Sequence, residues 1–132
     1  MANAPQGPQS TRLYTVEEAN RTILEVQPLL ERIREAVLKL TEEKTLAAVR
    51  EKASHNGGGE LVQELSKKAR VMEDDVQKIQ SLGIILRDPS IGLIDFLHRR
   101  SEVVCLCWKL GEGKSVQWWH PMETGIAGRQ RL

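Results

Sequence analysis

The chain has 132 residues, enough for one domain with a single hydrophobic core. Hydrophobic residues make up 40% of it and charged residues 28%, which is ordinary for a soluble globular protein. The formal net charge is +1, so the chain lacks the strong positive field of a dedicated nucleic-acid-binding protein. Its apolar runs are far shorter than the ~20 residues that a membrane span needs. We therefore expect neither a nucleic-acid partner nor a membrane span.

Residues 1–12 are rich in Ala, Pro, Gln, Gly and Ser, which predicts a disordered N-terminal lead. They contain no apolar core of the signal-peptide type, so we expect a cytoplasmic protein. Cys105 and Cys107 are then expected to stay reduced. Residues two apart on a strand also lie ~6.5–7 Å apart, at or beyond the usual Cα limit for a disulfide. Residues 13–132 should form a single domain, with a helical part at 15–82 and a β-unit at 83–132.

A long first helix is predicted from Val16 to about Ala53. Thr15 and Glu18 have the spacing of a capping box at its start. Pro28 leaves the apolar pattern in phase, which predicts either a kinked continuous helix or a tight break, and not a new domain. Apolar residues recur at alternating spacings of three and four, as in a heptad seam: Val16, Ala19, Ile23, Val26, Leu30, Ile33, Val37 and Leu40.

After a Gly-rich breaker at residues 54–59, a second helix is predicted from Glu60 to about Leu82, with Gly83 in the position that ends it. Its seam again alternates spacings of three and four: Val62, Leu65, Ala69, Met72, Val76 and Ile79. Two heptad helices with a short joint predict an antiparallel coiled-coil hairpin. Pairing two hairpins would cover the apolar stripe that one leaves exposed, so we expect a homodimer formed through the hairpin.

Four strands are predicted at residues 83–88, 92–97, 102–110 and 115–120, because these segments are rich in Ile, Val, Phe and Trp. Asp88-Pro89-Ser90 has the composition of a turn. Helices and strands do not alternate as they do in a parallel βαβ fold. The predicted fold class is therefore α+β, a two-helix hairpin followed by a small antiparallel sheet.

Several segments together resemble a known family. They are residues 14–20 (YTVEEAN), 83–88 (GIILRD), 92–96 (GLIDF), 107–112 (CWKLGE), 119–120 (WH) and 125–129 (GIAGR). This pattern is similar to a family of small, mainly bacterial proteins, the domain of unknown function number 2203, from about Leu13 to the C-terminus.

That family has no established activity, cofactor or partner, so the resemblance implies no mechanism. It places eight residues on recurring motif positions: Asp95, Cys107, Trp108, Glu112, His120, Gly125, Gly128 and Arg129. The chain departs from the pattern at Leu97, where many relatives have proline, and this leaves the direction of His98 open.

A metal or acid/base cluster is one candidate in the β-unit, drawn from Asp95, His98, Cys105, Cys107, His120 and Glu123. The metal set that we select is Asp95, Cys107 and His120, with Glu123 as an alternative to Asp95. Cys105 shares a strand face with Cys107, and thiolate, imidazole and carboxylate groups are zinc ligands. His98 points away from Asp95 on a regular strand, since the two are three residues apart. No recognised zinc spacing is present. The alternative is that the cysteines are small core residues and His120 is hydrogen-bonded at a strand end.

A ligand pocket is the second candidate, lined by Trp118, His120, Glu123 and Arg129 where the start of the first helix meets the β-unit. Against it, Arg129 can pin the C-terminal tail to a carboxylate, for which Asp95 or Glu17 are candidates. We find no catalytic motif, because no serine lies in a Gly-x-Ser-x-Gly elbow.

The sequence favours a non-catalytic interaction or oligomerisation module that acts through the hairpin and the Trp/His face. The alternative is a small-ligand or metal-binding protein, with or without enzymatic activity, whose site surrounds the C-terminal β-unit. A transition metal is the only cofactor that the residues suggest. Elemental analysis of the purified protein separates the two hypotheses.

Overall fold

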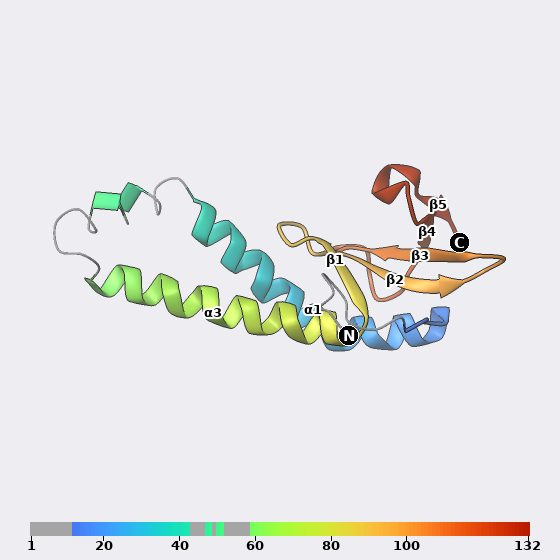
Figure 1. Cartoon of the computed structure of the whole chain (residues 1–132), viewed down its shortest axis with the longest axis horizontal. Coiled ribbons are helices and arrows are strands. Elements are labelled where there is room, and N and C mark those ends of the chain that lie inside the picture. The colour runs from blue at the N-terminus through green and yellow to red at the C-terminus, as the bar shows by residue number, and fades with distance from the viewer. Residues whose placement is uncertain (1–11, 43–46, 49, 52–58) are drawn as a thin grey trace, which may run out of the picture.

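The computed structural model describes residues 12–42, 47–48, 50–51 and 59–132. Two helices, α1 (Val16–Thr41) and α3 (Gly59–Ser81), precede a five-stranded antiparallel sheet. Its strands are β1 (Ile84–Asp88), β2 (Leu93–Arg99), β3 (Val103–Trp108), β4 (Trp118–Pro121) and β5 (Gln130–Arg131), with the 3-10 helix η1 (Gly125–Gly128) before β5. Figure 1 shows α1 and α3 side by side as a hairpin that projects beyond the sheet. The predicted α+β fold class is confirmed.

The start of α1 is fixed by the predicted capping box. The backbone N–H of Glu18 donates to Thr15 Oγ1 at 3.0 Å, and the N–H of Thr15 donates to Glu18 Oε1 at 2.9 Å. The helix continues through Pro28. In Figure 1 its blue first half lies under the sheet and its teal second half rises beside α3.

The prediction of one helix from Val16 to Ala53 is wrong at Glu42. This residue is extended, with φ −62° and ψ 129°, so α1 ends at Thr41. Thr41 and Glu42 offer no apolar side chain that could extend the buried seam, and threonine is a poor helix former. Most of the N-terminal lead and the Gly-rich joint, at residues 1–11 and 52–58, lie outside the described residues.

The sheet is a meander in which each strand pairs with its neighbours in sequence, in the order β1-β2-β3-β4-β5. The first three predicted strands agree with the structure to within two residues at each end. The fourth begins at Trp118 and not at Ser115, because the N–H of Val116 donates to Asn20 Oδ1 of α1 at 2.8 Å and not to a neighbouring strand. The fifth strand, only two residues long, was not predicted.

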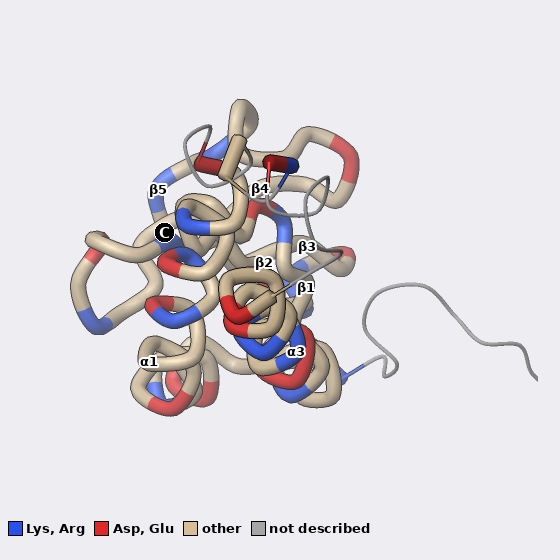
Figure 2. Tube along the Cα trace, turned by 90° about the vertical axis from the view of Figure 1, so that its left-hand side faces the viewer, with Lys and Arg blue, Asp and Glu red and all other residues tan. Residues whose placement is uncertain are grey.

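One face of the sheet packs against both helices, which lie on the same side of it in the end-on view of Figure 2. Side chains from this face, from both helices and from the flanking segments form the core: Tyr14, Ala19, Ile23, Val26, Leu30, Ile33, Ile79, Ile84, Ile94, Phe96, Leu106, Trp108 and Val116. Tyr14 ties the entry of α1 to the sheet, since its N–H donates to Leu97 O at 2.7 Å and its hydroxyl donates to Leu82 O. The first half of α1, which outruns α3, therefore packs on the β-unit.

Candidate metal site

The face of the sheet that points away from the helices carries the candidate residues. Side chains alternate along a strand, so Asp95 on β2 lies on the opposite face from its core neighbours. The register places Asp95 opposite Cys107, and Cys105 opposite His120. The predicted common face of Cys105 and Cys107 is thus confirmed, with Trp108 on the helix side.

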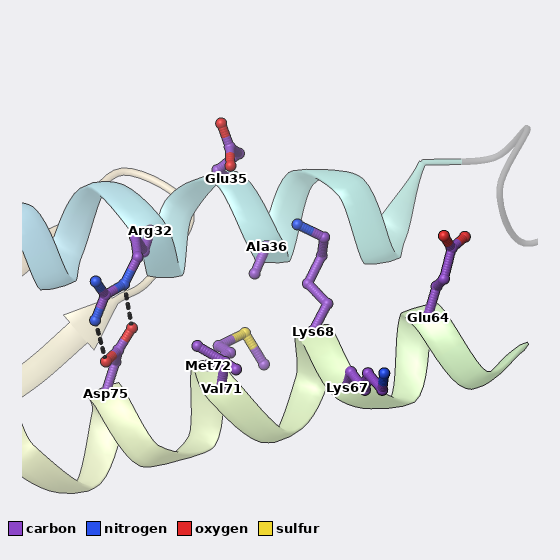
Figure 3. Close-up of a pocket in the computed structure, with 9 residues that line it drawn as sticks. All are labelled: Arg32, Glu35, Ala36, Glu64, Lys67, Lys68, Val71, Met72 and Asp75. Atoms are coloured by element: carbon purple, nitrogen blue, oxygen red, sulfur yellow. Dashed lines mark hydrogen bonds and ion pairs between the residues drawn. The ribbon is translucent and has the colours of Figure 1, made fainter. Parts of the chain in front are cut away.

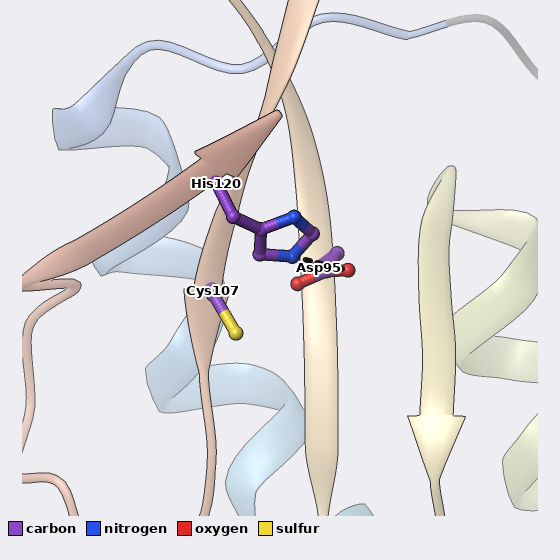
Figure 4. Close-up of side chains that lie close together, drawn as sticks. All are labelled: Asp95, Cys107 and His120. Atoms are coloured by element: carbon purple, nitrogen blue, oxygen red, sulfur yellow. Dashed lines mark hydrogen bonds and ion pairs between the residues drawn. The ribbon is translucent and has the colours of Figure 1, made fainter. Parts of the chain in front are cut away.

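Asp95, Cys107 and His120 converge on one point. A carboxylate oxygen, the thiol sulfur and a ring nitrogen of the three residues all lie within 4.8 Å of one another. Figure 4 shows the three side chains pointing together from β2, β3 and β4. Each residue is at most 1% exposed. The structure therefore brings together the three residues that the sequence suggested as metal ligands.

The imidazole of His120 faces an acceptor at both of its nitrogens. Nδ1 lies 2.7 Å from the carbonyl oxygen of Pro121, and Nε2 lies 3.0 Å from Asp95 Oδ2. A carbonyl only accepts, so Nδ1 carries a hydrogen, and in a neutral ring Nε2 is then a bare lone pair facing a carboxylate. Without a proton or a cation between Nε2 and Oδ2, this lone pair and the carboxylate would repel each other.

The two carboxylate oxygens of Asp95 differ in their hydrogen bonding. Oδ2 accepts a hydrogen bond from Arg87 Nε at 2.7 Å as well as facing His120. Oδ1 is buried and has no hydrogen-bond partner among the described residues. A buried oxygen without a partner costs its full desolvation energy, so such atoms are rare and call for an explanation.

The two thiols have different surroundings. Cys107 Sγ accepts from Arg129 Nε at 3.3 Å, whereas Cys105 Sγ lies 3.6 Å from Met122 Sδ and 3.9 Å from Arg87 Nη2. Burial raises the pKa of Cys107 to about 12 and that of Cys105 to about 11, although the neighbouring guanidinium opposes the rise in each case. Both cysteines are free, so at neutral pH they are protonated thiols unless a cation displaces the proton.

Arg129 closes the C-terminal tail over this cluster. Its Nη1 and Nη2 donate to the two oxygens of Glu112 at 2.5 and 2.7 Å, while its Nε points to Cys107. The pKa of Arg129 is raised, first by the hydrogen bond to Glu112. The predicted pinning role of Arg129 is therefore confirmed, but its carboxylate partner is Glu112 and not Asp95 or Glu17.

The predicted four-residue ligand pocket does not form at the start of α1. Trp118 and His120 belong to the face of the sheet away from the helices, and Arg129 lies over that face through its contact with Cys107. The helix side is taken up by apolar side chains. Trp118 instead lies against two guanidinium groups. The centre of its ring is 5.4 Å from Cζ of Arg129 and 5.3 Å from Cζ of Arg131. Glu123 is exposed in the turn after β4 and lies outside the cluster.

His98 is separate from the site, as its parity with Asp95 predicted. Its Nδ1 lies 2.7 Å from the carbonyl oxygen of Tyr14, at the entry to α1. Sequence reasoning missed Arg87 and did not assign a partner to Glu112. A signal existed for Arg87, since it is the one cation of β1, follows three apolar residues and lies near buried Asp95 across the β1–β2 pair.

Comparison with known proteins identifies a family but no function. The sequence model of the uncharacterized conserved proteins DUF2203 matches residues 12–132, nearly the whole chain. No curated protein and no solved structure matches the chain significantly. In the part of the chain that the structure describes, no helix is both long and apolar enough to cross a membrane.

Proposed function

We propose that this chain, which belongs to the DUF2203 family of uncharacterized conserved proteins, binds a transition-metal ion of the zinc type through Asp95, Cys107 and His120. The observation that carries the proposal is the convergence of three buried ligand atoms within 4.8 Å, one from each of three adjacent strands. Of the two hypotheses drawn from the sequence, this geometry favours the metal-binding one.

A cation at this point would resolve both irregularities of the cluster. It would sit on the bare lone pair of His120 Nε2, which now faces a carboxylate. It would also give a partner to Asp95 Oδ1. The hydrogen bond from His120 Nδ1 to the carbonyl oxygen of Pro121 is the outer contact that orients a ligating histidine in metalloproteins.

The donor set indicates which metals fit. A thiolate, an imidazole and a carboxylate suit borderline ions such as Zn²⁺, whereas Mg²⁺ and Ca²⁺ prefer oxygen ligands alone. Three protein ligands leave one position of a tetrahedral ion for water or a small molecule. Arg87 and Arg129, which donate to Asp95 and Cys107, would hold these two anionic ligands in place.

Location follows from the same chemistry. A ligating cysteine must be reduced, and both thiols are free. We propose a cytoplasmic location, where thiols persist in the reduced state.

The test compares Cys107→Ser with Cys105→Ser as a matched control. Both cysteines are buried on the same face of β3, but only Cys107 belongs to the ligand cluster. After equilibration with Zn²⁺ and gel filtration, we expect one zinc per chain in the unaltered protein and in Cys105→Ser, and none in Cys107→Ser. With Co²⁺ in place of zinc, a thiolate-to-metal absorption band should be present in the unaltered protein and in Cys105→Ser, and absent in Cys107→Ser.

Two results would overturn the proposal. One is a folded, unaltered protein that retains no zinc or cobalt after equilibration. The other is a Cys107→Ser variant that binds either metal as tightly as the control variant, since the thiolate would then not be a ligand.

A further inference from the structure

The far end of the helical hairpin carries a groove that the proposed metal site does not involve. The groove has a volume of 340 Å³ and lies between α1 and α3. Figure 3 shows Ala36 of α1 facing Val71 and Met72 of α3 across its floor. A second groove on the α3 surface, lined by residues between Ser66 and Val76, shares Met72 with the first. An apolar strip of α3 is thus open on both sides.

The apolar seam of α3 is covered only near the sheet. Ile79, next to the sheet, is fully buried, whereas Val76 and Met72 are only half-buried. Val71 is 50% exposed, and on α1 Leu38 is 54% exposed. A helix with an apolar stripe is stable where that stripe is buried, and among the described residues no covering layer lies over this end of the hairpin.

The groove carries both signs of charge in equal number. Three cationic and three anionic side chains line it. Arg32 and Asp75 pair with each other, which leaves Lys67, Lys68, Glu35 and Glu64 to face a partner. A groove of one sign would repel its own copy, whereas a balanced one can place opposite charges together across a two-fold axis. The view along the molecule in Figure 2 shows the same mixture of red and blue along α3.

We infer that the occupant of this groove is a second copy of the chain, packed hairpin against hairpin about a two-fold axis. The result is a four-helix layer that covers Val71 and Met72 of both copies. The shape permits it, because the far end of the hairpin lies clear of the sheet and a second hairpin can approach without meeting the β-unit (Figure 1). This assigns a partner to the interaction role that the heptad seams predicted.

The experiment uses sedimentation equilibrium of the full chain with a pair of matched variants. Val71→Glu places a charge in the groove, and Leu24→Glu places one at a site of similar exposure, 58%, on the first half of α1. We expect a dimer at tens of micromolar for the unaltered chain and for Leu24→Glu. Val71→Glu should raise the dimer dissociation constant about a hundredfold or more, because two buried like charges then face the interface.

Lys68→Glu is a second variant, which keeps the apolar floor and reverses one charge of the groove. It should also weaken the dimer, with the far-ultraviolet circular dichroism of the monomer preserved. The inference is overturned if the unaltered chain is monomeric up to ~100 µM, or if both groove variants dimerise as tightly as Leu24→Glu. Zinc stoichiometry should not change in any of these variants. The dimer and the metal site are therefore tested independently of each other.

Discussion

On the helix side of the sheet, Ile94, Phe96 and Leu106 are fully buried by apolar side chains of α1 and its neighbours. On the other side, Asp95 and His120 are buried just as completely, but among guanidinium groups, thiols and a carbonyl oxygen. Apolar burial stabilises a fold by itself, whereas burial of a charged or polar group costs free energy unless its partners are present. Residues of equal exposure thus contribute to stability with opposite signs on the two faces. Only on the polar face would a bound ligand supply the partners that the buried groups need.

The strongest test of the apolar face is Phe96→Ala. Phe96 is fully buried and meets the ring of Tyr14 edge-on at 4.9 Å, so its removal should lower the free energy of unfolding by about 3–5 kcal/mol. Urea unfolding followed by circular dichroism measures it. Leu97→Ala, at the half-buried position next to it, should cost less. A loss below ~1 kcal/mol for Phe96→Ala would show that this face is not the core.

Truncation along the hairpin should show where the apolar core ends. Ile33 is fully buried, so Ile33→Ala should cost about 2–4 kcal/mol. Met72 is only half-buried, so Met72→Ala should cost clearly less in the monomer, because less apolar area returns to water. The measurement is urea unfolding at a protein concentration low enough to keep the chain monomeric. If the two variants lost the same free energy of unfolding, the apolar core would extend along the hairpin at least as far as Met72.

The polar face should respond to pH through its metal affinity. Burial raises the pKa of Cys107 to about 12, so the thiol must lose a proton when the metal binds. Affinity for Zn²⁺ should therefore rise about tenfold, or ~1.4 kcal/mol, for each pH unit between pH 6 and 8. Competition with a chromophoric chelator measures the slope. Cys105→Ser should keep this slope, and a flat profile in both proteins would show that no thiolate binds.

The smallest effect is expected at the rim of the polar face, where Glu112 pairs with Arg129. Burial acts to raise the pKa of Glu112, but the hydrogen bonds from Arg129 and from the Lys109 N–H lower it below its usual 4.5. The pair therefore stabilises the fold above pH 4.5, and this contribution is lost as the pH falls below that value. Glu112→Gln should cost at most about 1 kcal/mol at pH 7, after allowance for solvent screening. Its melting temperature should fall less steeply with acid than that of the unaltered protein.

Much of the fold could be predicted because its signals are local. The capping residues Thr15 and Glu18, the heptad spacing and Gly83 each act within a few residues of their own position. The end of α1 at Thr41 and the late start of β4 depend on distant contacts or their absence, such as the bond between Asn20 and Val116. Periodicity carries no information about such contacts.

The residues of the site could be predicted from the sequence, but the face of the sheet on which they lie could not. Strand parity correctly separated His98 from Asp95 and grouped Cys105 with Cys107. It could not tell which face the helices would cover, so Trp118, His120 and Arg129 were placed at the wrong surface. The partner of Arg129 depends on the turn at Gly111 and on how η1 folds the tail back, and neither is encoded in strand alternation.

The strand order β1-β2-β3-β4-β5 has a consequence for the kinetics of folding. Every pairing joins segments adjacent in the chain, so the sheet closes only short loops and should form quickly. The first half of α1 is different, because the bond between Asn20 and Val116 spans 96 residues. Its docking closes this long loop, and we expect it to be the slow step that converts a preformed meander into the native protein.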